Sequence, residues 1–344
     1  MINYKIPRAR AITEDIFYAS GIPSDNEIED NFTRVYQYYK GGWGHADAPV
    51  STQYIALYHR PEGGRIAVYV SSDGNVFSPE PSFKCAPIID GGLKLTKKTG
   101  RIAAIRQAGS TLLACGDYGN NYRRNENGLW VPLDLSLFDD YVDPNWAFAI
   151  KGEGATFAEL DAYWEAHPDE KAESDRRLAL FTRGLMLMSI HGSNENDVYM
   201  CGQDGAVYHW DGTRSQKNSR ADGSLPQRHP GRRRRHGLDL RARRDLAARQ
   251  CPPGFTLVSC EGQPDFNTVT RFRDKIYLSS YAGPRGVFVC DGRIRQLTTG
   301  PSAVFKDINT VDGVADALWA FGLTSVARFD GTKWERIKLP KWSD

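Results

Sequence analysis

The stretch that decides the fold is residues 198–212, VYMCGQDGAVYHWDG. It reads as a short strand, a Gly-Asp-Gly type turn, a second strand and then the Asp211-Gly212 turn. Gly, Asn and Asp tolerate the positive φ angles that tight hairpin turns require. The stretch therefore predicts a β-hairpin that leads through a turn into a further strand.

This unit recurs along the chain at a nearly constant spacing. Gly292 and Gly331 are 39 residues apart, Gly74 and Gly119 are 45 apart, and Gly212 and Gly292 are 80 apart, which is two periods. Four short strands in about 40 residues make one blade of a β-propeller. The copies occupy residues 66–77, 112–130, 198–212, 276–292 and 318–334, with a sixth implied in the 80-residue interval.

We therefore predict an all-β fold, a β-propeller of six to seven blades that forms a single domain over residues 1–344. The runs at residues 35–39 and 54–58 are rich in Val, Ile and Tyr and read as further strands. We expect them either to supply a seventh blade or to close the ring against the carboxyl-terminal strands.

The implied copy falls in residues 214–253, which show no strand periodicity and contain four consecutive arginines, 232–235. Three interpretations compete: a basic arm for nucleic acid, an irregular loop, and a blade translated out of frame. Codon degeneracy favours the third. Allowed synonymous codons for residues 237–244, read from the second base of each codon, encode VWICGRDG, which matches residues 198–205, VYMCGQDG, at an offset of 39. Segment 214–253 is then an irregular frameshift scar.

Segment 214–253 also dominates the charge of the chain. It carries 12 Lys or Arg and 3 Asp, a net charge of +9, whereas the whole chain carries +2 and the remainder therefore −7. A mildly acidic remainder offers no general field for phosphates. We expect no nucleic-acid partner, and a chain less stable than one in which the blade is in frame.

A helical insertion is predicted at residues 155–183. Thr156 and Glu159 form a capping-box pattern, Leu160, Tyr163 and Trp164 recur on one helical face, and Pro168 suits the start of a second helix. Tyr163 and Trp164 either pack the insertion onto the propeller or form an exposed aromatic binding patch. Candidate binding residues are these two aromatics and three aspartates of the most acidic stretch, Asp139, Asp140 and Asp143.

The sequence lacks the common catalytic and metal-binding motifs. The chain has no GxSxG elbow, Walker loop, HExxH or CxxC pair, so we predict no catalytic residues, metal or cofactor. The first residues carry no apolar run typical of a signal peptide, and no stretch is as long as a membrane helix. We expect a cytoplasmic protein without membrane contact.

The repeat resembles known propeller families. Residues 209–211, His-Trp-Asp, resemble the end of a WD repeat, although the opening Gly-His is absent, and residues 71–77, SSDGNVF, resemble an Asp-box with one residue missing. The overall rhythm is most similar to uncharacterised bacterial propellers. That resemblance implies a fold and not an activity.

Two function classes follow from the sequence. The first is a monomeric, non-catalytic protein-binding scaffold, and the sharpest version is an immunity-like protein that neutralises a bacterial toxin. The second is a hydrolase or lyase with its site at the propeller channel. Asp, His and Arg converging on the channel would favour the enzyme, whereas an exposed aromatic patch at Tyr163 and Trp164 would favour binding.

Overall fold

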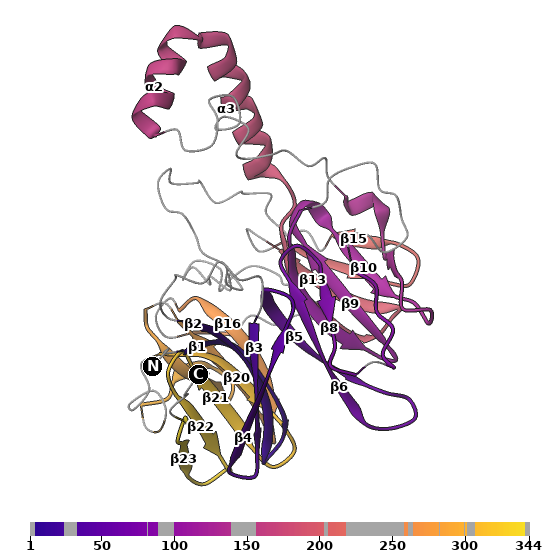
Figure 1. The fold of residues 1–344 in the computed structure, drawn as a ribbon, viewed down its shortest axis with the longest axis vertical. Helices are drawn as coiled ribbons and strands as arrows, with labels where there is room; N and C mark the ends of the chain where they lie inside the picture. Colours follow the sequence, from indigo (N-terminus) through magenta and orange to yellow (C-terminus); the bar gives the residue numbers. More distant parts are fainter. Residues whose placement is uncertain are drawn as a thin grey trace.

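Six antiparallel sheets follow one another along the described part of the chain, together with one helical hairpin (Figure 1). The computed structural model describes residues 4–23, 33–80, 82–88, 100–138, 156–202, 206–217, 258–260, 264–281, 283–298, 300 and 307–340. Each sheet is a meander of strands that are consecutive in the chain, which is the blade of a propeller. The predicted fold class is confirmed.

The blades follow the chain order. Blade 1 contains β1 (Tyr4–Thr13), β2 (Ile16–Pro23), β3 (Thr33–Tyr39) and β4 (Gly42–Ala48), and blade 2 contains β5 (Thr52–His59), β6 (Arg65–Ser71) and β7 (Val76–Phe77). Blade 3 contains β8 (Ile102–Ala108), β9 (Thr111–Gly116), β10 (Asn121–Arg124) and β11 (Trp130–Pro132), and blade 4 contains β12 (Leu187–Asn194), β13 (Asp197–Gly202), β14 (Val207–Trp210) and β15 (Ser215–Lys217). Blade 5 contains β16 (Phe266–Phe272), β17 (Lys275–Ser280), β18 (Gly286–Cys290) and β19 (Ile294–Gln296), and blade 6 contains β20 (Ile308–Gly313), β21 (Leu318–Gly322), β22 (Val326–Phe329) and β23 (Trp334–Ile337). Short 3₁₀ turns lie at Asp117–Gly119 and Leu135–Leu137.

The amino-terminal strands resolve one of the sequence alternatives. Residues 35–39 lie in β3, inside a complete blade of their own, and residues 54–58 lie in β5, the first strand of the next blade. Blade 1 packs face to face against blade 6, which holds the last strands of the chain. The ring is therefore joined at this point by packing between two whole sheets.

The same Asp-Gly turn shapes the outer hairpin of several blades. In blade 4 the Asp211 carboxylate accepts hydrogen bonds from the backbone N–H groups of Thr213 and Arg214, at 2.9 and 3.0 Å. In blade 6 Asp330 accepts from the residues at the same positions, at 2.7 and 2.9 Å. Gly212 follows with φ +94°, a region that side chains with a Cβ rarely adopt. The Asp-Gly pairs of the sequence repeat therefore form the same turn in blades 4 and 6.

Apolar clusters join five pairs of neighbouring blades. Five clusters of buried residues span blades 1 and 2, 2 and 3, 3 and 4, 5 and 6, and 6 and 1. The inner strands carry this packing, with β12 on β8, β8 on β5, β5 on β1, β1 on β20 and β20 on β16. A sixth cluster, Phe266, Leu278 and Phe288, belongs to blade 5 alone. Among the described elements no comparable packing joins β12 of blade 4 to β16 of blade 5.

Blade 4 is well buried on one face only. Val198 and Met200 of β13 are fully buried against blade 3, while the alternate residues Tyr199 and Cys201 are half-buried. All five residues of β21 in blade 6, by contrast, are buried. A sheet that packs between two neighbouring sheets is buried on both faces. The second face of blade 4 is only half-buried, as expected for a sheet that has a neighbour on one side only.

The chain between blades 4 and 5 is long enough for another blade. Residues 218–265, 48 in number, separate β15 from β16, whereas three residues separate β4 from β5 and 11 separate β19 from β20. Ser215–Lys217, the first residues of the segment predicted to be irregular, form β15 and pair with β14. Residues 218–257 lie outside the described part of the chain, so the frameshift stays a prediction.

The helical insertion is confirmed. Helices α2 (Phe157–Ala166) and α3 (Pro168–Arg183) form a hairpin that projects from the ring (Figure 1). The capping box is present, because Thr156 N–H donates to Glu159 Oε2 at 2.7 Å and Glu159 N–H donates to Thr156 Oγ1 at 3.3 Å. No helix in the described residues has the length and apolar character needed to cross a bilayer.

The contact between blades 1 and 6 predicts the effect of a core substitution. Trp319 is fully buried, its ring meets Phe17 edge-on at 5.0 Å, and its Nε1–H donates to Thr13 O at 3.0 Å. Trp319→Ala is expected to lower the free energy of unfolding by about 3–5 kcal/mol, measured by urea denaturation. Leu135→Ala, at a side chain that is 63% exposed, should change it by less than about 0.5 kcal/mol. Equal effects of the two variants would contradict this packing.

Because blade 4 is buried on one face only, we can predict how the chain changes when residues 218–253 are translated in the shifted frame. A chain whose residues 218–253 are translated in the shifted frame is expected to unfold at a higher temperature and to protect Cys201 from a thiol reagent. The physical reason is that a seventh sheet would cover the half-buried face. Peptide mapping of the labelled cysteines measures this, with the half-buried Cys85 as an internal control whose labelling stays constant. Unchanged labelling of Cys201 would refute the prediction.

Candidate functional site

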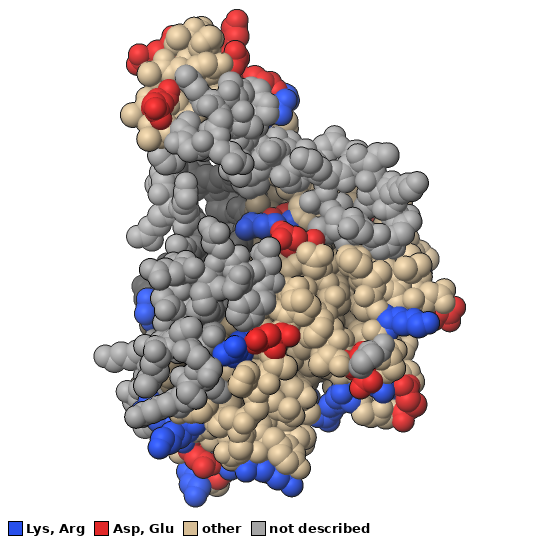
Figure 2. Space-filling view, viewed as in Figure 1, with Lys and Arg blue, Asp and Glu red and all other residues tan. Residues whose placement is uncertain are grey.

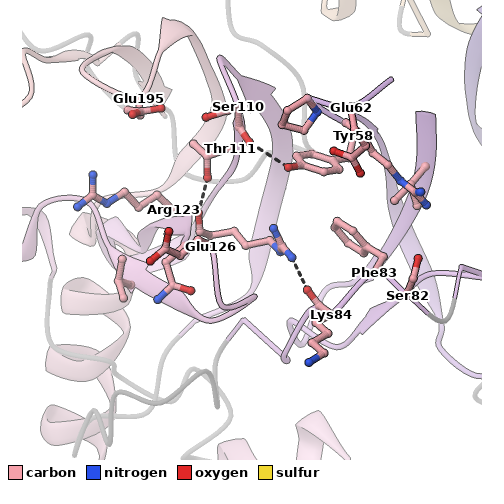
Figure 3. Close-up of a pocket in the computed structure, with 16 residues that line it drawn as sticks. Tyr58, Glu62, Ser82, Phe83, Lys84, Ser110, Thr111, Arg123, Glu126 and Glu195 are labelled. Carbon is pink, nitrogen blue, oxygen red and sulfur yellow. Dashed lines mark hydrogen bonds between the residues drawn. The ribbon is translucent and has the colours of Figure 1, made fainter. Parts of the chain in front are cut away.

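A groove between blades 2 and 3 has a volume of about 920 Å³ (Figure 3). Residues from β5, from the chain after β7 and from β10 line it. Its walls are both apolar and charged, as is usual for a surface that binds another protein. The lining residues used below are Tyr58, Glu62, Phe83, Lys84, Arg123, Arg124 and Glu126.

An aromatic and guanidinium stack forms the floor of this groove. The Arg124 guanidinium lies 4.4 Å from the centre of the Phe83 ring and 5.7 Å from that of Tyr58, and it also donates to Lys84 O. Tyr58 is nearly buried, and its hydroxyl donates to Ser110 O at 3.1 Å. Figure 3 shows these bonds tying the labelled side chains to two blades. The floor is therefore held in place before any ligand arrives.

Charges of both signs surround the floor. Lys84, Arg123, Glu62 and Glu126 are all exposed around the groove. Acidic and basic side chains are likewise interspersed over the face of the molecule in Figure 2. Exposed charges of this kind contribute more to partner choice and association rate than to affinity.

A second hollow lies at one mouth of the central channel and has a volume of about 750 Å³. Five blades contribute to it, and its lining brings together Arg10, His59, Arg106, His191 and Asp312. Asp, His and Arg thus converge on the channel, which is the arrangement expected for the enzyme alternative. Among the described residues, however, no hydrogen bond joins either histidine ring to a carboxylate in this mouth.

The channel mouth contains a partly buried ion pair. Arg10 Nη1 lies 3.6 Å from Asp312 Oδ2, and the same oxygen accepts the Ala11 N–H at 3.0 Å. Burial raises the pKa of Asp312, and Arg10 opposes that rise. Burial also lowers the pKa of His59, with Arg65 adding to the effect. Loss of contact with water therefore disfavours the charged form of both groups.

The two predicted aromatic residues lie in the insertion, away from both hollows. Trp164 is buried, and Tyr163 is half-buried with its ring stacked on His167 at 4.1 Å. The Tyr163 hydroxyl donates to Glu170 Oε2 at 2.7 Å, which raises the pKa of Tyr163. Asp139, Asp140 and Asp143 lie outside the described residues. The assignment of all five as binding residues stays a prediction.

Sequence reasoning missed both hollows. The groove depends on Arg124 meeting Phe83, which is 41 residues earlier in another part of the chain, and no motif marks that pair. The channel arginines did leave a signal, because Arg8 and Arg10 alternate on β1 and alternate residues share a face. Two arginines on the inner strand of a blade indicate a charged channel.

The comparisons with known proteins support the fold. No known protein family and no curated protein matches the chain. Among solved structures it is similar to the WD40 β-propeller domain of Doa1, with 11% identity, 95% of this chain and 93% of that chain covered, and a TM-score of 0.53. It also matches the β-propeller domain of the Trilobed protease from Pyrococcus furiosus, with 8% identity, 97% and 95% covered, and a TM-score of 0.46. The chain has a β-propeller fold, and identities this low carry no activity with it.

The neighbouring residues Arg123 and Arg124 provide a matched test of the groove floor. Arg124→Ala is expected to lower the free energy of unfolding by about 1–2 kcal/mol, because it removes a partly desolvated cation–π contact and its packing. Arg123→Ala, at an exposed side chain, should change it by less than about 0.5 kcal/mol. Urea denaturation of both variants measures the difference, and equal losses would contradict the stack.

Proposed function

We propose that this protein is a non-catalytic protein-binding scaffold and that the groove between blades 2 and 3 takes the partner. The observation that supports it is the preformed floor of Tyr58, Phe83 and Arg124 beneath a ring of exposed charges. Aromatic residues and arginine supply most of the binding energy in protein interfaces when they lie in a packed centre with a polar rim. The rigidity of this floor also favours binding, because its side chains lose little conformational entropy when a partner binds.

The partner that we propose is a bacterial toxin. The repeat resembles motif-poor bacterial propellers, and proteins of that kind include partner-binding and toxin-neutralising members. In this proposal the protein acts as a monomer in the cytoplasm and blocks the toxin by occupying its surface. Tyr163, Trp164, Asp139, Asp140 and Asp143 remain proposed as further binding residues, apart from the groove.

The second candidate is a hydrolase or lyase at the channel. The observation that favours it is the meeting of Arg10, His59, His191 and Asp312 in one mouth. The pKa of Asp312 is raised and that of His59 is lowered, and perturbed pKa values of ionisable groups in one hollow are common at catalytic sites. Substituting His59 with Gln would abolish an activity of this type and would leave capture of a partner at the groove intact.

Charge reversal at the groove rim tests the scaffold. Immobilised protein is incubated with lysate of the native host, and bound proteins are identified by mass spectrometry. We expect one partner to bind the unchanged chain and to be lost, by at least about tenfold, with Glu62→Arg and Glu126→Arg together. Asp274→Arg, an exposed reversal on the turn between β16 and β17, is the control and should retain the partner.

Two results decide against this proposal. Retention of the partner by the double groove variant would remove the groove from the interface, and recovery of no partner at all would count against a scaffold. The toxin assignment has its own readout, since expression of the identified partner should stop growth of cells and co-expression of this protein should restore it. Failure of that rescue would overturn the toxin assignment alone.

A further inference from the structure

Three arginines line one small cavity in the central channel. Arg8 and Arg10 come from β1 of blade 1, and Arg106 comes from β8 of blade 3. The cavity has a volume of about 120 Å³ and continues into the channel mouth, because Arg10 and Arg106 line both. The chain thus places three permanent positive charges around one enclosed space.

The charges in this cavity are poorly compensated. Its described lining contains no carboxylate, and the nearest, Asp312, is shared with the mouth and lies against Arg10. Arg8 and Arg10 each use their Nε–H on a backbone carbonyl of blade 2, Gln53 O and Ile55 O, both at 3.1 Å. Within the described residues, no hydrogen bond engages the terminal nitrogens of Arg8 or Arg106. Burial lowers the pKa of Arg8, and the nearby Arg10 adds to that effect.

A buried hydroxyl in the same cavity lacks a partner. Thr310 lines the cavity, is only 3% exposed, and its Oγ1 makes no hydrogen bond. Buried polar atoms are nearly always paired, because an unpaired one costs about 1–3 kcal/mol. Guanidinium N–H groups can only donate, and a hydroxyl can donate as well as accept, so a single acceptor would satisfy both kinds of group.

The geometry points to a carboxylate as that acceptor. We propose that the channel binds a carboxylate-bearing ligand whose acidic group enters this cavity between Arg8, Arg10 and Arg106, with the rest of the ligand in the mouth. A planar guanidinium binds a carboxylate through two parallel hydrogen bonds, and a cavity of this size admits one such group. The mouth, at about 750 Å³, has room for the remainder of a small molecule or for the end of an acidic peptide. This site is separate from the groove and does not depend on the proposed scaffold.

Calorimetric titration with succinate, at constant ionic strength, tests the inference. We expect saturable binding and a rise in the thermal midpoint, with neither seen for the neutral analogue succinamide. Arg106→Gln should weaken binding by at least about tenfold, since it removes a charge-assisted pair. Lys333→Gln, which removes the same charge from an exposed turn of blade 6, should leave binding unchanged.

A second readout separates a binding role from a structural one. Without ligand, Arg106→Gln is expected to raise the thermal midpoint, because it removes one positive charge from a cavity whose described lining holds three arginines and no carboxylate. A lowered midpoint, equal binding by Arg106→Gln and Lys333→Gln, or no saturable binding of any carboxylate would overturn the proposal. A parallel titration with a short peptide ending in two glutamates identifies the source of the carboxylate. Tighter binding of the peptide than of succinate indicates a protein partner, and the reverse indicates a small molecule.

Discussion

Packing of apolar side chains between the faces of adjacent blades is the interaction on which the other features of this protein depend. Hydrogen bonds complete each sheet internally, while the cohesion between sheets comes mainly from buried rings and aliphatic side chains. The meeting of Phe17 with Trp319 and Phe321, at 5.0 and 5.1 Å, is the clearest example, since it joins the first and last blades of the chain. Burial of such side chains contributes about 25 cal/mol for each Å² removed from water.

This packing also determines where polar groups can meet. A blade face must be apolar, so charged side chains are left to the inner edge, the outer edge and the turns. Arg8 and Arg106, on the inner strands of different blades, are brought to one cavity because the sheets that carry them are locked against a common neighbour, blade 2. The groove that contains Arg124 lies between blades 2 and 3 and is a second place where residues of two packed sheets come together.

Local patterns in the sequence predicted local structure well. The Asp-Gly turns, the strand alternation and the Thr156 capping box each depend on residues a few positions apart, and each is present as expected. The meeting of Phe83 with Arg124, and that of Arg8 with Arg106, depend on how far each blade rotates against the next, which no local pattern encodes. Trp164 shows a further limit, because helical periodicity identified its face but could not say whether that face is buried.

Every described blade is completed within one uninterrupted stretch of chain. None of the described sheets takes a strand from a distant segment, so the loss of one blade would leave the hydrogen bonding within the others intact. The blade is therefore a unit whose loss or replacement would uncover one face on each neighbouring blade and would leave the strand pairing elsewhere unchanged.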